Sequence, residues 1–365
     1  MAKFEGVRWA PNQLQWILKS RQKNFLSSDA KTYAVSRSIH YGIFLVFEGI
    51  RFFAYRDDSN RIAIRFCNLD KNLERFLQGL AYSLGPELSR ALPTKEELRT
   101  FIVDDYLLSP MLRPFLLDML EDQAQGYLRP FTLDEEQSIG VTFPANPSIR
   151  LAACKYDRYL GEPFEGVVIP HLVRAVRANQ TGCLKLGTNY LISVKAVEEA
   201  KRTEPNANAA LFLDDRCDLP LHERELTEWD SSCILLALRD GRIIKIPEGP
   251  LILPSVTIRG IVSLAREEGI PVEERAVRYG ELIELVKTDQ LVCICSIGTA
   301  GILNRCSRLS LLNAERQPQW IHEPDTEHPL YEALARLRRR YWQVYKGEHP
   351  APLDMKIYNR LVSEP

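Results

Sequence analysis

A lysine set among small residues is the feature of this sequence best suited to chemistry. Lys185 lies in the run Gly182-Cys183-Leu184-Lys185-Leu186-Gly187-Thr188-Asn189-Tyr190, and an amphipathic helix pattern, Leu191 to Lys201, follows at once. Glycines let the backbone approach another group closely, and a partly desolvated lysine amine can attack a carbonyl to form a Schiff base. A surface lysine in a glycine-rich turn would show the same residues, so both interpretations stay open on this stretch alone.

Two other stretches could bind an anion through backbone N–H groups. The first, Leu253 to Gly260, places a proline and then small residues at the start of a predicted helix, where the helix dipole favours a phosphate. The second, Ser296 to Gly301, predicts a tight turn after a buried strand. A helix start and a turn would explain each stretch without a ligand.

Two charged side chains could complete such a site. Glu228 is predicted to lie just before a strand, and Arg75 lies on the first long predicted helix, from which it could close a phosphate site from the other domain. Taken singly, a solvent-facing glutamate and a surface arginine are the ordinary explanations. The case for a shared site therefore depends on all of these stretches together.

The overall composition indicates a globular protein of two domains. The chain has 365 residues, of which 45% are hydrophobic and 26% charged, and this length exceeds what one hydrophobic core usually serves. A net charge of -1 gives no reason to expect nucleic acid or an anionic membrane as partner. The start of the chain lacks the apolar core of a signal peptide, and no apolar run could span a bilayer. We therefore expect a cytoplasmic protein.

The eight cysteines predict no metal site, because none forms a CxxC pair and the histidines are not clustered. Cys293 and Cys295 alternate within an apolar run and are predicted to face one side of a strand as buried thiols.

Residues 1–153 are predicted to form a smaller α+β domain. We expect an irregular arm with one short helix over residues 1–35. After it comes a hairpin turning at Asp57-Asp58-Ser59-Asn60, then helices from Lys71 to Ser83 and from Thr94 to Leu107. Two further strands are predicted, Tyr127 to Phe131 and Ile149 to Ala153.

A polar connector over residues 154–163 is predicted to lead into a larger α/β domain, residues 164–365. Apolar, strand-like runs there alternate with helical patterns, and Asp240-Gly241 fits a hairpin turn. The predicted strands are Ala209 to Leu213, Cys233 to Leu238 and Leu291 to Ile297, and the predicted helices are Val256 to Glu268, Gly280 to Lys287 and Pro329 to Tyr345.

In order and spacing, these stretches resemble the fold-type IV pyridoxal-phosphate enzymes, which include the D-amino acid aminotransferases. They most resemble the longer branched-chain amino acid aminotransferases. The resemblance runs from about residue 36 almost to the end of the chain. The motifs that carry it are Ser38-Ile39-His40-Tyr41-Gly42, Phe47-Glu48-Gly49-Ile50-Arg51, Tyr127-Leu128-Arg129-Pro130, the segment from Arg174-Ala175 to Tyr190, Leu253-Pro254-Ser255-Val256-Thr257, and Gly298-Thr299-Ala300.

The resemblance implies a role for each matching residue. Lys185 would hold pyridoxal 5'-phosphate as a Schiff base and move the substrate's proton, while Glu228 would face the pyridine nitrogen. Other residues would contact the cofactor's hydroxyl and phosphate: Tyr190 the hydroxyl, and Arg75, Val256, Thr257 and Thr299 the phosphate. The remaining matches would bind the substrate: Thr299 and Ala300 its α-carboxylate, and Tyr127, Arg129, Phe47 and Tyr41 the rest of it.

Three positions depart from the family's pattern. After the glutamate the family has a pattern like E-x-G-x-x-N, where this chain has Asp230 and Cys233. Cys293 stands where the family has a glutamate shortly before the Gly-Thr-Ala turn. Asp230 adds a negative charge near the predicted cofactor ring. These changes leave Schiff-base chemistry possible and weaken the inference that leucine, isoleucine and valine are the substrates.

The resemblance implies a homodimeric transaminase that exchanges an amino group between an amino acid, with a branched-chain-like donor, and a 2-oxo acid such as 2-oxoglutarate. Two alternatives stay open. One is a relative with a different substrate, such as a D-amino acid transaminase, an amine transaminase or an aminodeoxychorismate lyase. The other is a degenerate homologue that binds pyridoxal phosphate without catalysis.

Overall fold

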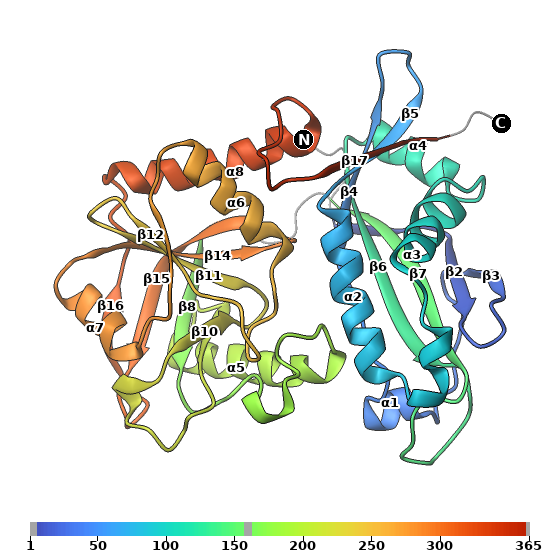
Figure 1. Cartoon of the computed structure of the whole chain (residues 1–365). Coiled ribbons are helices and arrows are strands. Elements are labelled where there is room, and N and C mark those ends of the chain that lie inside the picture. Colours follow the sequence, from blue (N-terminus) through green and yellow to red (C-terminus); the bar gives the residue numbers. More distant parts are fainter. Residues whose placement is uncertain (1–5, 157–162, 363–365) are drawn as a thin grey trace. The chain divides into compact units, whose positions relative to one another are not determined.

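The computed structural model describes residues 6–156 and 163–362 (Figure 1). These residues fall into two compact units. Of the described residues, unit 1 comprises 6–156, 185–188 and 356–362, and unit 2 comprises 163–184 and 189–355. The segment that carries the predicted Schiff-base lysine thus belongs to unit 1, while the residues on both sides of it belong to unit 2.

Unit 1 contains one antiparallel sheet, with the strand order β17-β5-β4-β6-β7-β2-β3 and with β1 also paired to β7. The β4–β5 hairpin closes over Asp57–Asn60, which confirms that prediction. The strands are β1 (Val7–Trp9), β2 (Asn12–Ile17), β3 (Lys23–Ser27), β4 (Ile50–Arg56), β5 (Ile62–Cys67), β6 (Gln125–Asp134), β7 (Pro147–Tyr156) and β17 (Ile357–Leu361).

The prediction of an irregular N-terminal arm with a short helix is wrong, because β1, β2 and β3 occupy that region. Leu14 and Trp16 of β2 are buried, and they pair with Leu151 and Ile149 of β7. Few apolar residues alternate in this stretch, and its strands form because they add to a sheet built by residues far along the chain. Strand propensity depends strongly on such tertiary context.

The helices of unit 1 are α1 (Arg37–Tyr41), α2 (Leu69–Ser83), α3 (Lys95–Ile102) and α4 (Arg113–Glu121). Thr94 and Glu97 form a reciprocal capping box at the start of α3, which fixes the predicted helix start. The rest of that predicted helix continues as a π-helical turn, Val103–Leu107. Helix α2 packs along the segment before β4, where Gly79 leaves room for the side chain of Val46.

Unit 2 contains a mixed sheet in the order β10-β9-β8-β15-β14-β11-β12-β13, with β16 paired to β15. The pairs β8–β9, β8–β15 and β12–β13 are parallel, and the other pairs are antiparallel. Its strands are β8 (Phe164–Ile169), β9 (Ala209–Leu213), β10 (Leu226–Trp229), β11 (Cys233–Leu238), β12 (Ile243–Lys245), β13 (Val272–Glu274), β14 (Leu291–Gly298), β15 (Ile302–Leu312) and β16 (Pro318–His322).

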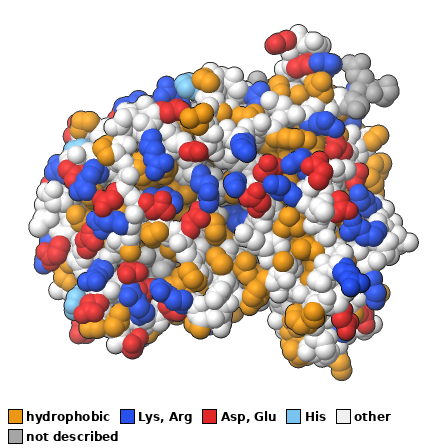
Figure 2. All heavy atoms as spheres, viewed as in Figure 1, with side chains coloured by type: hydrophobic (Ala, Val, Ile, Leu, Met, Phe, Trp, Pro, Cys, Tyr) orange, Lys and Arg blue, Asp and Glu red, His pale blue; other side chains and the backbone are white. Residues whose placement is uncertain are grey.

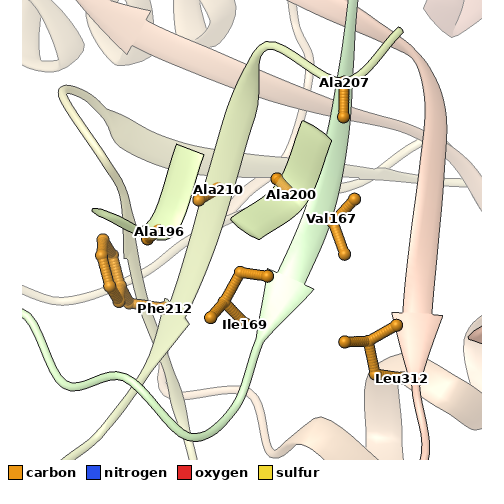
Figure 3. Close-up of a cluster of buried hydrophobic side chains, with 8 residues drawn as sticks. All are labelled: Val167, Ile169, Ala196, Ala200, Ala207, Ala210, Phe212 and Leu312. Carbon is orange, nitrogen blue, oxygen red and sulfur yellow. The ribbon is translucent and has the colours of Figure 1, made fainter. Parts of the chain in front are cut away.

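The helices of unit 2 are α5 (Tyr190–Thr203), α6 (Val256–Glu267), α7 (Tyr279–Lys287) and α8 (Pro329–Lys346). Figure 3 shows α5 against β8 and β9, with Ala196 and Ala200 facing Val167, Ile169 and Phe212 in a buried cluster. The small alanines let the helix approach the strands closely, so the sheet fixes the orientation of the helix that follows the lysine segment.

Two predicted boundaries need correction. Residues 154–156, predicted as connector, extend β7, and the side chain of Lys155 is fully buried against Asp118 and Asp122. Residues 157–162 of the predicted connector lie outside the described residues. Residues 357–361, predicted to lie in the C-terminal domain, form β17 in unit 1, because they pair with β5 over five residues.

The surface shown in Figure 2 carries basic and acidic side chains interspersed with apolar ones. Within residues 6–156 and 163–362, no helix combines the length and the apolar character needed to cross a membrane.

Candidate active site

Backbone pairing within unit 1 fixes the position of Lys185. The N–H of Phe47 donates to the Lys185 carbonyl at 3.1 Å, and the N–H of Gly187 donates to the Leu45 carbonyl at 2.8 Å. Val46 and Leu186 form an antiparallel bridge between these two bonds. The lysine segment therefore behaves as a short extra strand, and this pairing sets the direction in which the Lys185 side chain leaves the backbone.

Three of the predicted substrate residues form a series of contacts that begins at Lys185. The Lys185 amine is 4.9 Å from the centre of the Phe47 ring, and the Arg129 guanidinium carbon is 4.7 Å from the same ring. Arg129 also donates to the Tyr127 hydroxyl at 2.7 Å. These half-buried side chains form a cation–aromatic cluster, in which ring faces and positive charges attract one another.

Tyr41, the fourth predicted substrate residue, lies at the end of α1. Its side chain is 46% exposed, and its hydroxyl donates to the Ile139 carbonyl at 3.0 Å. Its predicted contact with the substrate therefore stays a prediction.

Arg75 is buried in unit 1 and forms an ion pair with Glu48. Its Nε donates to Glu48 Oε2 at 2.8 Å and a terminal nitrogen to Oε1 at 2.5 Å, while the N–H of Gly49 also donates to Oε1 at 2.7 Å. This bidentate geometry holds the guanidinium plane rigidly. The predicted contact between Arg75 and a phosphate stays a prediction, and Glu48 is an unpredicted partner that orients the arginine.

In unit 2, Glu228 lies within β10, whereas the sequence placed it just before a strand. The carboxylate is 2% exposed, and its Oε1 is 2.7 Å from a terminal nitrogen of Arg174 and 3.2 Å from the N–H of Leu253. A buried carboxylate needs such partners to stay charged. Arg174 had no predicted role, yet its side chain is only 4% exposed, so its guanidinium requires a buried acceptor.

The start of α6 offers backbone donors, as predicted from the stretch at Leu253. Ser255 caps the helix, and its hydroxyl accepts the N–H of Ile258 at 3.2 Å. Val256 and Thr257 begin the first turn, where N–H groups have no acceptor within the helix. The first turn carries no acidic side chain. This helix end is therefore suited to an anion.

The predicted turn after a buried strand also occurs in unit 2. β14 ends at Gly298 and β15 begins at Ile302, with Thr299, Ala300 and Gly301 at the tip. The tip is tightly packed, because a Cβ on Gly301 would lie 2.2 Å from Nδ2 of Asn304. Tyr190, also in unit 2, is the first residue of α5 and is half-buried.

A sequence model of the family "Amino-transferase class IV" matches residues 45–297. The chain belongs to this family. It is a pyridoxal-phosphate-dependent transaminase, and the matched range includes the lysine segment, Glu228 and the start of α6.

Several similar proteins are named as branched-chain amino acid aminotransferases. A probable branched-chain-amino-acid aminotransferase of Staphylococcus aureus strain N315 is 27% identical over 332 residues, which are 90% of this chain and 82% of that protein. The branched-chain aminotransferase of Thermoproteus uzoniensis, crystallised with norvaline, shares the fold at a TM-score of 0.68 and 21% identity, covering 96% of this chain and 100% of that one. The T.th. branched-chain amino acid aminotransferase, complexed with N-(5'-phosphopyridoxyl)-L-glutamate, matches at a TM-score of 0.64 and 22% identity, covering 92% and 95%.

The donor set of the chain fits pyridoxal phosphate. Unit 1 supplies an amine, Lys185, against an aromatic ring, and unit 2 supplies a buried carboxylate, Glu228, and a capped helix start with N–H donors. An aldehyde, a pyridine nitrogen and a phosphate need these three kinds of group.

The three departures from the family pattern have different surroundings. The Asp230 carboxylate accepts the N–H of Ala210 at 3.1 Å, and burial raises the pKa of Asp230 above its ordinary value. The thiol of Cys233 donates to the Leu253 carbonyl at 3.5 Å. Cys293 is fully buried, with its Sγ 4.0 Å from that of Cys295, which confirms the prediction that both thiols face one side of a strand.

Proposed function

We propose that this transaminase exchanges an amino group between a branched-chain-like amino acid and a 2-oxo acid such as 2-oxoglutarate, through Lys185. The observation that carries the proposal is the chain of contacts in unit 1 from the lysine amine to the Phe47 ring, from that ring to Arg129, and from Arg129 to the Tyr127 hydroxyl. The names of the relatives support the donor class. The phosphopyridoxyl-glutamate in the T.th. enzyme supports a second substrate of the glutamate type.

The cluster suits substrates of two kinds. The ring faces of Phe47 and Tyr127 offer apolar surface to an aliphatic side chain. Arg129 offers a guanidinium to a second carboxylate, the group that distinguishes glutamate and 2-oxoglutarate from leucine. Arginine binds carboxylates with directional, charge-assisted hydrogen bonds. A single surface with both features can accept the amino donor and the oxo-acid acceptor in turn.

When bound, pyridoxal phosphate supplies an aldehyde that condenses with amines and a ring that accepts the electrons left at the substrate's α-carbon. Lys185 would hold it covalently through Nζ and, once displaced, would take up the proton that leaves the α-carbon. Glu228, held by Arg174 and the N–H of Leu253, would keep a proton on the pyridine nitrogen. Val256 and Thr257 would bind the phosphate through their N–H groups, and Arg75 and Thr299 would add side-chain donors.

Tyr190 would donate to the cofactor's ring hydroxyl, and Thr299 and Ala300 would bind the α-carboxylate of the substrate. We further propose that the chain works as a homodimer in the cytoplasm. The eight cysteines lie within the described part of the chain and form no disulfide bonds there, which suits a reducing compartment.

The covalent role of Lys185 is tested by chemical trapping. Borohydride reduction of the protein loaded with pyridoxal phosphate is expected to add one phosphopyridoxyl group to the peptide that contains Lys185, located by mass spectrometry. The variant Lys185→Ala is expected to take up none. Lys195→Ala removes an exposed lysine of the adjacent helix and serves as the matched control. Labelling that persists in Lys185→Ala would contradict the assignment.

The substrate class is tested by the visible absorption of the bound cofactor. A panel of L-amino acids, D-amino acids and simple amines is added, and the 2-oxo acid or aldehyde product is measured. We expect branched-chain L-amino acids to change the band fastest and to yield their 2-oxo acids. A response confined to D-amino acids or amines would replace the proposed substrate with one of those classes. A loaded protein that responds to no donor would be a cofactor-binding homologue without catalysis.

A further inference from the structure

The short segment Glu228–Cys233 contacts both the loop that leads into α6 and the end of β14, next to the two turns proposed to bind anions. It joins β10 to β11 and is closed by the N–H of Trp229, which donates to the Ser232 carbonyl at 2.9 Å. It is also anchored to β9 and α5, because Asp230 pairs with Ala210 and its carbonyl accepts the hydroxyl of Ser193 at 2.7 Å. The segment is therefore fixed at several points and can hold other groups in place.

One end of the segment holds the loop that leads into α6. The N–H of Leu253 donates to Glu228 Oε1 at 3.2 Å, and its carbonyl accepts the Cys233 thiol at 3.5 Å. Both polar backbone groups of Leu253 are thus bound to this segment. Pro254 follows and restricts the backbone further, and Ser255 then caps the helix. The direction of the first-turn N–H groups depends on this hold.

The other end holds the turn between β14 and β15. The hydroxyl oxygens of Ser232 and Ser296 are 2.6 Å apart, and Ser296 lies two residues before Gly298. Gly298 packs against the same serine, because a Cβ there would lie 3.3 Å from Cβ of Ser232. This contact fixes the strand end from which Thr299 and Ala300 project.

The turn needs such support because its backbone is strained. Ile302, the first residue after the tip, has a φ of 65°, which is unfavourable for a β-branched residue. A strained conformation persists only where the surrounding structure holds it. Asn304 packs against Gly301 and is 3% exposed, but its Oδ1 has no hydrogen-bond partner within the described chain. The hydrogen bond between Ser232 and Ser296 therefore helps to keep this turn in its strained conformation.

We propose that Cys233 and Ser232 are positioning residues for two different anions. Cys233 orients the N–H groups of Val256 and Thr257 toward the cofactor phosphate. Ser232 orients the Thr299–Ala300 turn toward the substrate carboxylate. This inference rests on the proposed function, since it takes from there which anion each turn binds. It assigns separate tasks to adjacent residues, so each variant is a control for the other.

The phosphate arm is tested with cofactor-free protein. Dissociation constants for pyridoxal phosphate and for pyridoxal, which lacks the phosphate, are measured by fluorescence titration. We expect Cys233→Ala to weaken binding of pyridoxal phosphate about 3- to 10-fold, the effect of losing one hydrogen bond, and to leave pyridoxal binding unchanged. Cys233→Ser retains a donor and is expected to restore the preference. Cys306→Ala, which removes a buried thiol of β15, is the matched control.

The carboxylate arm is tested with protein loaded with pyridoxal phosphate. The probe is 4-methylpentanoate, a carboxylate without an amino group, and its binding is measured by calorimetry. We expect Ser232→Ala to weaken it about 3- to 10-fold and Cys233→Ala to leave it unchanged. Ser310→Ala, which removes another buried hydroxyl with a side-chain partner, Glu204, is the control. Melting temperatures show that each variant is folded.

Three outcomes are decisive. The inference is supported if Cys233→Ala weakens only pyridoxal phosphate and Ser232→Ala weakens 4-methylpentanoate more than pyridoxal phosphate, since Thr299 is also proposed to contact the phosphate. Variants that lower the melting temperature and weaken both probes equally, or that change neither probe, overturn it and leave these residues a structural role only. If the wild-type protein binds pyridoxal as tightly as pyridoxal phosphate, the assigned phosphate site fails, and the positioning role of Cys233 fails with it.

Discussion

The groups proposed to bind cofactor and substrate differ in kind between the two units. In unit 1 the groups are side chains on a strand surface, where Lys185, Phe47, Tyr127 and Arg129 contact one another through rings and charges. In unit 2 they are mainly backbone N–H groups at the start of α6 and at the turn after β14, with Glu228 as the buried charge. Side chains can change without altering the fold, whereas backbone donors move only when their anchors move.

This difference indicates that substrate recognition, which depends on side chains, can vary more easily than phosphate binding, which depends on the backbone. A substrate pocket built from side chains can be altered by single substitutions. A phosphate site built from N–H groups recognises the same anion whatever side chains surround it. The three departures from the family pattern, Asp230, Cys233 and Cys293, lie in unit 2 and leave its backbone turns intact. We therefore expect the largest effects on chemistry from unit 1 and the largest effects on stability from unit 2.

The strongest test of unit 1 is removal of its amine. Lys185→Ala is expected to lower the rate of 2-oxo acid formation by about 1000-fold or more, because both the covalent attachment and the proton carrier are lost. Lys195→Ala is expected to keep the wild-type rate. A wild-type rate in Lys185→Ala would show that Lys185 does not take part in the reaction, and the contrast between the two units would not hold.

Acid is expected to destabilise unit 2. His322 is 6% exposed, and burial lowers its pKa from 6.5 to about 4, so it is neutral in the folded state. The unfolded chain takes up a proton near pH 6.5 while the folded chain does not, so stability is full above that pH and falls towards pH 4. The loss is about 3 kcal/mol at most. Unit 1 has one histidine, His40, which is exposed.

Urea unfolding between pH 7.5 and pH 4, read by hydrogen exchange in each unit, measures this loss. In His322→Gln the decline over this range is expected to shrink. An equal decline in the variant and the wild type would assign the acid sensitivity to other groups.

Glycine substitutions in the lysine segment compare the two units directly. A Cβ on Gly182, in unit 2, would lie 2.5 Å from the Pro250 carbonyl oxygen, and backbone cannot move aside as a side chain can. A Cβ on Gly187, in unit 1, would lie 3.3 Å from Cβ of Leu45. We expect Gly182→Ala to cost about 1–3 kcal/mol and Gly187→Ala less, as measured by chemical denaturation. The reverse order would show that the backbone of unit 1 is the more constrained.

The smallest expected effect concerns the substrate side chain. Arg129→Leu is expected to raise KM for 2-oxoglutarate about 10-fold and to change KM for L-leucine little, because only the former has a second carboxylate. Arg65→Leu removes an arginine that stacks 4.4 Å from the Tyr55 ring, and it is expected to change neither value. Equal increases for both substrates would assign Arg129 to holding Tyr127 in place.

Local signals in the sequence predicted the elements around the site. The Asp57–Asn60 hairpin, the helix start at Val256 and the turn at the end of β14 each depend on a few adjacent residues, and each occurs in the structure. Contacts between distant residues were missed. The partners of the two buried carboxylates, Arg75 for Glu48 and Arg174 for Glu228, are separated from them by 27 residues and more in the chain. Nothing in the residues around a glutamate shows which arginine will reach it.

The same reasoning explains the error over residues 1–35. Leu14 and Trp16 pair with β7, which lies more than a hundred residues later in the chain, and Trp16 also packs against Phe101. Local composition predicted an irregular arm, and long-range pairing produced strands.

Because the chain passes from one unit to the other several times, the two units cannot be exchanged separately by recombination. Four residues, Lys185–Thr188, belong to unit 1, although the chain on both sides of them belongs to unit 2, and β17 returns to unit 1 at the end. Recombination that exchanged residues 160–355 as one block would also replace the short segment that pairs with Leu45 and Phe47, and with it the lysine. Neither unit can be transferred to another protein as an independent module that keeps the amine in its aromatic surroundings. We therefore expect substitutions at Leu45, Val46 and Phe47 to be accompanied, over evolutionary time, by substitutions at Leu186 and Gly187.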